Sequence, residues 1–115
     1  MAYFLIIEPH EDVRRLYAAV VRGLGHEPVL FQKANVSPRP DVLLVEPAHA
    51  ESFEVALAMR EQCPDLPIVC ASIYEPTEKE VHLLRATSYL LKPFSLVQLT
   101  DALEAAFAQC DGVSC

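Results

Sequence analysis

Four polar side chains in the sequence stand at the ends of short apolar segments: Glu8, Glu46, Ser72 and Lys92. The carboxyl ends of the strands of an open parallel sheet converge on one crevice, where ligands and charged groups collect. We therefore expect two carboxylates, one hydroxyl and one ammonium to lie close together. Together they would present two negative charges, one positive charge and one hydroxyl group at one edge of the sheet.

The apolar segments that precede these side chains have the length of β-strands and alternate with helical patterns. We expect strands at residues 3–7, 28–31, 41–45, 67–72 and 88–91. Apolar side chains at three- and four-residue spacing predict helices at residues 12–24, 51–62, 78–86 and 96–107. This alternation predicts an α/β fold with a five-stranded parallel sheet and right-handed crossovers.

Several residues mark where these helices begin and end. Gly23 or Gly25 supplies the stop of the first helix, and Thr77 with Glu80 three residues later forms a capping box. Ser95 caps the last helix. The apolar stripe expected on that helix consists of Leu96, Leu99, Leu103, Ala106 and Phe107.

The connection between the second and third strands is short. Only about nine residues separate Phe31 from Asp41, and they include Ser37-Pro38-Arg39-Pro40. A strand-helix-strand crossover usually needs at least about 10–12 residues. We therefore expect the second helix of the alternating pattern to be shortened or absent.

Taken in this order, the residues resemble the receiver domain of two-component response regulators, a phospho-accepting module with a CheY-like, flavodoxin-like fold. The resemblance covers nearly the whole chain and implies the strand order 2-1-3-4-5. It implies the following roles: Glu8 is the first acid of the pocket, Glu46 stands in place of the phosphorylated aspartate, Ser72 is the switch hydroxyl, Tyr89 is the switch aromatic, and Lys92, followed by Pro93, is the lysine characteristic of the family.

Two departures from the family pattern affect its chemistry. Glu46 replaces the phospho-acceptor aspartate, and Pro9 stands where the family has a second acid that holds Mg²⁺. Octahedral Mg²⁺ tolerates missing ligands poorly, and an acceptor displaced by about 1 Å can lose on the order of 100-fold in rate. We expect no cofactor, with Mg²⁺ binding weak or lost, and no phosphorylation.

The longer side chain of Glu46 leaves two interpretations open. It could reach toward Lys92 and Ser72 and mimic a phosphoryl group, or it could form a structural ion pair with Lys92. Glu46→Gln separates the two, because a mimic would lose partner binding whereas a structural pair would mainly lose thermal stability.

Histidines and cysteines offer weaker candidates for chemistry. His10 and His49 follow neighbouring strand ends and are candidates for a transition-metal site, although no HxH or HxxxH spacing supports one. The four cysteines lack CxxC spacing, so we expect isolated thiols that act as small apolar side chains.

Length and charge exclude several classes of protein. The 115 residues suit one domain, expected at 1–110 with a flexible tail at 111–115, and the net charge of −7 argues against nucleic-acid binding. No apolar run is long enough to span a membrane and no secretory signal is recognisable, so we expect a cytoplasmic protein.

We therefore expect a non-enzymatic, atypical receiver domain that acts in signal transduction by phosphorylation-independent protein interaction. One alternative is a diverged response regulator still phosphorylated by a histidine kinase in a phosphorelay. A second is a small flavodoxin-like metal-binding or redox protein. Residues 78–85, 89–91 and 96–107 would form the face for protein partners or for a C2 homodimer. The sequence leaves open the partner, the oligomeric state and whether the chain is a fragment.

Overall fold

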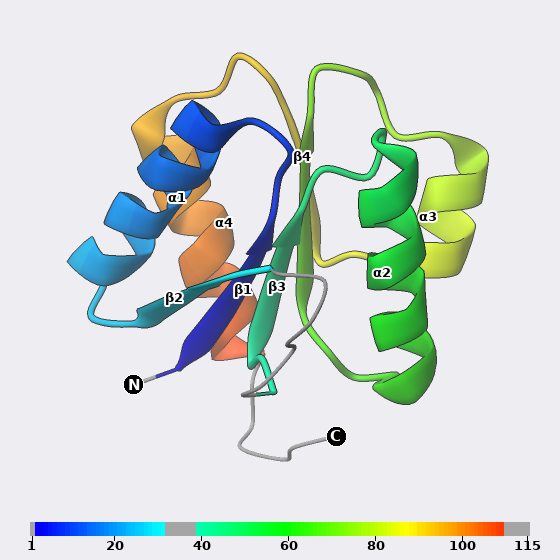
Figure 1. Ribbon diagram of the computed structural model, residues 1–115, viewed down its shortest axis with the longest axis horizontal. Helices are drawn as coiled ribbons and strands as arrows, with labels where there is room; N and C mark the ends of the chain where they lie inside the picture. The colour runs from blue at the N-terminus through cyan, green and yellow to red at the C-terminus, as the bar shows by residue number, and fades with distance from the viewer. Residues whose placement is uncertain (1, 32–38, 110–115) are drawn as a thin grey trace.

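The computed structural model describes residues 2–31 and 39–109, which form a five-stranded sheet flanked by four helices (Figure 1). The strand order is β2-β1-β3-β4-β5, and every pair of neighbours is parallel, as predicted. The elements are β1 (Tyr3–Ile7), α1 (Glu11–Gly23), β2 (Glu27–Leu30), β3 (Val42–Val45), α2 (Ala50–Gln62), β4 (Ile68–Ser72), α3 (Glu78–Leu84), β5 (Ser88–Leu91) and α4 (Leu96–Ala108).

The helices form two layers that bury opposite faces of the sheet. Successive side chains of a strand point to opposite faces. Phe4 and Ile6 of β1 therefore join the core under α1 and α4, whereas Leu5 and Ile7 join the core under α2 and α3. Figure 1 shows the same division, with α1 and α4 together on one side of the sheet and α2 and α3 on the other. The central strand β3 is buried on both faces, as its unbroken apolar sequence predicts.

The predicted helix caps are present. The Thr77 hydroxyl accepts the backbone N–H of Glu80 at 3.1 Å, and the Glu80 carboxylate accepts the N–H of Thr77 at 3.2 Å. Ser95 makes the same reciprocal pair with Gln98. After α1 the chain turns at Gly25, whose φ of +87° suits glycine. The predicted stripe of α4 is right at Leu99, Leu103 and Ala106, which are buried, and wrong at its two ends, because Leu96 and Phe107 are exposed.

Two predictions fall mainly outside the described residues. The segment expected to hold a shortened second helix lies mostly within residues 32–38, and the expected flexible tail lies within residues 110–115.

β2 lies at the edge of the sheet, as Pro28 within it predicts. Among the described residues, no helix is long and apolar enough to cross a membrane.

A buried arginine that the sequence analysis did not single out joins α2 to α3. Arg60 is 4% exposed, and its guanidinium donates to the carbonyls of Leu84 at 2.7 Å, Pro64 at 2.8 Å, Cys63 at 3.2 Å and Arg85 at 3.4 Å. Burial lowers the pKa of this guanidinium, and the nearby Arg85 charge lowers it further. The arginine therefore ties the end of α3 to the end of α2 through backbone acceptors.

Candidate functional site

The carboxyl ends of β1, β3, β4 and β5 lie at one edge of the sheet and bring most of the predicted residues together. The backbone N–H of Glu46 donates to the carbonyl of Ile7 at 3.0 Å, which places the residue after β3 beside the end of β1. The N–H of Lys92 donates to the carbonyl of Ser72 at 2.7 Å, which does the same for β5 and β4. The peptide bond between Lys92 and Pro93 is cis.

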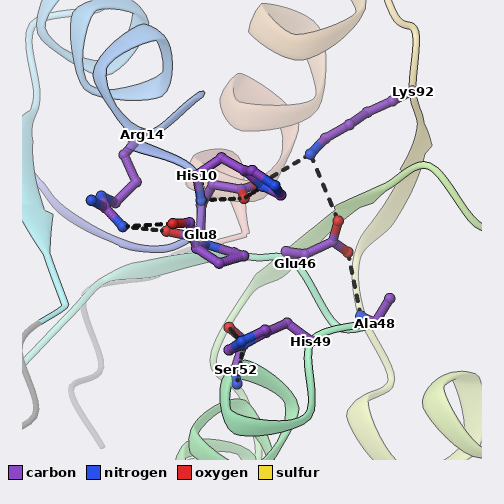
Figure 2. A network of polar contacts seen from close by, with 9 residues as sticks. Glu8, His10, Arg14, Glu46, Ala48, His49, Ser52 and Lys92 are labelled. Carbon is purple, nitrogen blue, oxygen red and sulfur yellow. Dashed lines mark hydrogen bonds and ion pairs between the residues drawn. The ribbon is translucent and has the colours of Figure 1, made fainter. Parts of the chain in front are cut away.

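Lys92 bridges the two buried acids of the crevice. Its Nζ lies 2.9 Å from Oε1 of Glu8 and 3.7 Å from Oε1 of Glu46, and Figure 2 shows the lysine reaching across the crevice to both. Glu8 and Glu46 are only 4% and 8% exposed. Because charges this buried need compensation, the ammonium is what allows two carboxylates to remain side by side. We call Glu8, Glu46 and Lys92 the ion cluster.

Glu8 is the most heavily bonded member of the ion cluster. Its second oxygen, Oε2, accepts the backbone N–H of His10 at 3.0 Å and lies 3.0 Å from Nδ1 of the same histidine. Burial favours the neutral acid, but the bonds from His10 and Lys92 outweigh it, so the pKa of Glu8 lies below its ordinary value of 4.5. Glu8 is therefore charged at neutral pH, and both of its oxygens are already engaged.

Glu46 is held more loosely. Its Oε2 accepts the N–H of Ala48 at 3.3 Å, and its contact with Lys92 is longer than a hydrogen bond. No hydrogen bond joins Glu46 to the Ser72 hydroxyl, the contact that one of the two interpretations required, among the described residues; this hydroxyl accepts the N–H of Tyr74 at 3.2 Å. The structure therefore gathers the two acids and the lysine, while Ser72 bonds within its own loop.

Arg14 borders the crevice and was missed by the sequence analysis. Its Nη1 donates to the carbonyl of Glu8 at 2.8 Å and to that of Pro9 at 3.2 Å (Figure 2). The arginine thus fixes the turn between β1 and α1, where the family resemblance implies a second acid. The sequence places Arg14 one turn into a predicted helix that follows the polar end of a strand, and this position could have indicated that it borders the crevice.

Tyr89 is half-buried on the edge strand β5. Its hydroxyl accepts the backbone N–H of Ala86 at 3.2 Å, and its ring packs into the core beneath α2 and α3. Burial raises the pKa of this phenol. The tyrosine also lines a cavity together with Ser72, so the two residues predicted to form a switch are neighbours in space.

The candidate metal ligands do not converge. Nδ1 of His10 contacts Glu8, whereas Nδ1 of His49 lies 3.1 Å from the Ser52 hydroxyl and caps α2. Within residues 2–31 and 39–109, no group of three or more His, Cys, Asp or Glu side chains could hold a metal ion. Pro9 contributes no side-chain oxygen, and the Lys92 ammonium contacts both acids that a cation would need. The side chains present therefore do not fit the Mg²⁺ site that the resemblance implies.

The cysteines differ from one another. Cys70 is a free thiol, buried in β4, and burial raises its pKa to about 12. Cys63 is disulfide-bonded, so the prediction of an isolated thiol is wrong for that residue.

No family model and no curated protein matches the sequence. Among solved structures, NtrX from Brucella abortus matches 95% of this chain at 22% identity and a TM-score of 0.79, and this chain spans 27% of it. Chemotaxis protein CheY4 of Vibrio cholerae matches 92% of this chain and 98% of its own, at 23% identity and a TM-score of 0.79.

A third solved structure is a response regulator from Thermotoga maritima, TrrA, in complex with Mg²⁺ and beryllofluoride. It matches 92% of this chain and 99% of its own, at 18% identity and a TM-score of 0.75. These matches establish the arrangement of the backbone. At identities this low they do not show the chemistry of the site, which depends on its own residues. The chain therefore has the CheY-like, flavodoxin-like fold found in response regulator receiver domains.

Proposed function

We propose that this protein is an atypical receiver-like signalling module that binds a partner protein without being phosphorylated. The receiver fold supports a role in signal transduction, and the ion cluster supports independence from phosphate. The observation that carries the proposal is the 2.9 Å contact between Nζ of Lys92 and Oε1 of Glu8. It pairs the lysine with an acid of its own chain.

This contact matters because phosphoryl transfer to a carboxylate depends on cations. The charge that develops must be neutralised by a metal ion and by a lysine free to approach the phosphoryl oxygens. Here the lysine already neutralises Glu8 and, less closely, Glu46. The place of the second acid is occupied by Pro9, which offers no carboxylate. Both requirements of the reaction are therefore weakened in the same crevice.

The two distances from Lys92 favour a structural role for Glu46 over phosphoryl mimicry. A mimic would engage the lysine and the switch hydroxyl more closely than any other group does. The lysine is instead closer to Glu8, and the Ser72 hydroxyl bonds to Tyr74. Under this proposal, Glu46→Gln lowers stability slightly and leaves partner binding within about twofold, a change worth less than about 0.5 kcal/mol.

The surface formed by α3, β5 and α4 is the proposed site of contact with partners. Several large apolar side chains are exposed on these elements, namely Val81, Leu91, Leu96, Val97 and Phe107. Exposed apolar side chains gathered on neighbouring elements mark interaction sites more often than isolated ones do. The same surface could serve a partner protein or a second copy, and the mass in solution measured by light scattering distinguishes the two.

Treatment with radiolabelled acetyl phosphate and Mg²⁺ tests the proposal. We expect no incorporated label in the wild-type protein. The variant Pro9→Asp/Glu46→Asp returns both acids to the crevice and serves as the positive control, with label that hydroxylamine releases. Label on the wild-type chain that disappears in Glu46→Gln would show that the phosphorelay alternative is correct and the proposal wrong.

A further inference from the structure

Beside the ion cluster, a cavity of about 300 Å³ opens between β5 and the connection from β4 to α3. Tyr89 and Leu91 of β5 form one wall, while Tyr74 and Pro76 of the connection belong to the other. Cys70, buried in β4, contributes to its base. Ser72 and Leu91, the last residues of β4 and β5, also line it, so the cavity reaches the edge of the sheet at which the candidate site is formed.

The base of this cavity is suited to binding and not to reaction. Burial, together with the charges of Glu80 and Glu46, raises the pKa of the Cys70 thiol to about 12. A thiol that stays protonated at neutral pH is a poor nucleophile and behaves as a small apolar side chain. An apolar group entering the cavity would therefore meet a thiol, two tyrosines, two prolines and leucine residues of β5.

The rim of the cavity continues as an exposed apolar surface. Ile73 is 61% exposed, Tyr74 is 64% exposed and Leu91 is 46% exposed. The pairing of Ser72 with Leu91 in neighbouring strands brings the segment after β4 beside the end of β5. A ligand filling the cavity would therefore also touch apolar surface outside it. This favours a polypeptide over a small molecule, because the cavity is at the lower end of the roughly 300–1,000 Å³ typical of small-molecule sites.

The charged groups around the cavity are acidic. Glu75 and Glu80 line it, and no lysine or arginine is among the described residues that do. The two nearest lysines in the sequence are engaged elsewhere, since Nζ of Lys92 contacts Glu8 and Nζ of Lys79 lies 5.4 Å from the centre of the Phe53 ring. One oxygen of Glu80 accepts the N–H of Thr77, which holds its carboxylate at the start of α3. The rim therefore complements a cation.

We propose that this cavity is the anchor point for the partner, and that it takes one leucine or phenylalanine side chain from a polypeptide segment in which lysine or arginine flanks it. The apolar side chain enters between Tyr74 and Tyr89, and the flanking cation pairs with Glu75 or Glu80. The inference rests on the proposed function in requiring a protein partner, and it adds the chemistry by which that partner is recognised.

Titration of the ¹⁵N-labelled protein with two short peptides tests the anchor. One peptide is acetyl-Lys-Leu-Phe-Lys-amide and the other replaces both lysines with glutamate, each added to about 5 mM, which detects dissociation constants into the millimolar range. We expect the basic peptide to shift the amide resonances of Cys70, Tyr89 and Leu91, and the acidic peptide to bind at least about threefold more weakly. EDTA in the buffer keeps this result independent of Mg²⁺ and phosphate.

Matched variants locate the binding. Glu75→Gln and Glu80→Gln should each weaken the basic peptide about two- to threefold, since an exposed charge pair contributes about 0.5 kcal/mol. Leu91→Lys should abolish binding, whereas Leu16→Lys, at a similarly exposed leucine of α1, should leave it unchanged.

Equal affinity for the two peptides, shifts centred away from the cavity, or no shift at all would overturn the anchor. Phosphorylation of Glu46 would instead overturn the proposed function, and the labelling experiment detects that failure separately.

Discussion

Lys92 and Arg60, two cations of the described residues, are held within the fold by different kinds of acceptor. At the crevice, Lys92 is compensated by the carboxylates of Glu8 and Glu46. At the far ends of α2 and α3, Arg60 is surrounded by backbone carbonyls, and no carboxylate contacts it among the described residues. The first arrangement balances charge, whereas the second satisfies hydrogen bonds.

The difference matters because the two sets of acceptors respond differently to conditions. Carboxylates gain protons in acid and can exchange one cation for another, so the ion cluster depends on pH. Carbonyls have no such equilibrium, and the planar fork of an arginine matches several of them at once. We infer that the Arg60 contacts hold the two helices together, whereas the ion cluster balances buried charge.

The largest expected effect comes from removing the arginine. Arg60→Met leaves several buried carbonyls without a donor, and we expect it to lower the free energy of unfolding by about 3 kcal/mol. Urea denaturation measures this loss. Arg22→Met, on the exposed face of α1, is the control and should change little. An Arg60→Met protein as stable as wild type would show that the contacts with α3 are dispensable.

Removing Lys92 should lower the free energy of unfolding by less than removing Arg60 does, and the size of this loss should depend on pH. Lys92→Met leaves two buried carboxylates uncompensated, and we expect a loss of about 2 kcal/mol at pH 7. Part of this loss should be recovered in acid, because protonation relieves the repulsion between the acids. Lys79→Met removes an exposed lysine and provides the control. A loss that is the same at every pH would contradict the charge-balancing role.

Glu8 and Glu46 should contribute unequally to stability. Glu8→Gln removes a carboxylate that makes several short hydrogen bonds, and we expect it to lower the free energy of unfolding by about 1.5 kcal/mol. Glu46→Gln removes a charge 3.7 Å from Nζ of Lys92 and should cost about 0.5 kcal/mol. Thermal unfolding of the two variants side by side measures the difference. The reverse order would mean that Glu46, not Glu8, is the main partner of Lys92.

The pH dependence of stability should distinguish the ion cluster from the Arg60 contacts. The pKa of Glu8 is lower in the folded protein than its ordinary value of 4.5, so its contribution is fully present above that pH and is lost as the pH falls through the folded value. The stability difference between wild type and Glu8→Gln should therefore be constant at neutral pH and shrink below it. The difference between wild type and Arg60→Met should not shrink. A Glu8→Gln difference that persisted well below pH 4.5 would refute the assignment.

Much of the fold followed from local patterns in the sequence. Tyr3–Ile7 and Ser88–Leu91 are strands with the predicted limits, and the caps at Thr77 and Ser95 form the predicted bonds. Periodicity and capping involve residues close together in the chain, which is why a single sequence is enough to reveal them. The convergence of Glu8, Glu46 and Lys92 followed from topology, because the ends of parallel strands share one edge of the sheet.

What the sequence did not reveal depends on side-chain rotamers and on distant partners. Nothing local distinguishes Arg60 from an exposed arginine, since its acceptors at Leu84 and Arg85 lie 24 and 25 residues away. The preference of Lys92 for Glu8 over Glu46 is set by differences of less than 1 Å between side chains. Nor did the sequence show that the Ser72 hydroxyl accepts the backbone N–H of Tyr74.

We infer that Lys92, held by Glu8 and Glu46, is not free to bind a phosphoryl group. An amide NMR titration with Mg²⁺ and then beryllofluoride, which mimics an acyl phosphate on a competent acceptor, tests this inference. We expect a spectrum that neither addition changes. Shifts centred on Glu46, Ser72 and Lys92 and extending to Tyr89 would contradict it, because they would show that Lys92 can leave Glu8 and that the crevice still accepts a phosphoryl group.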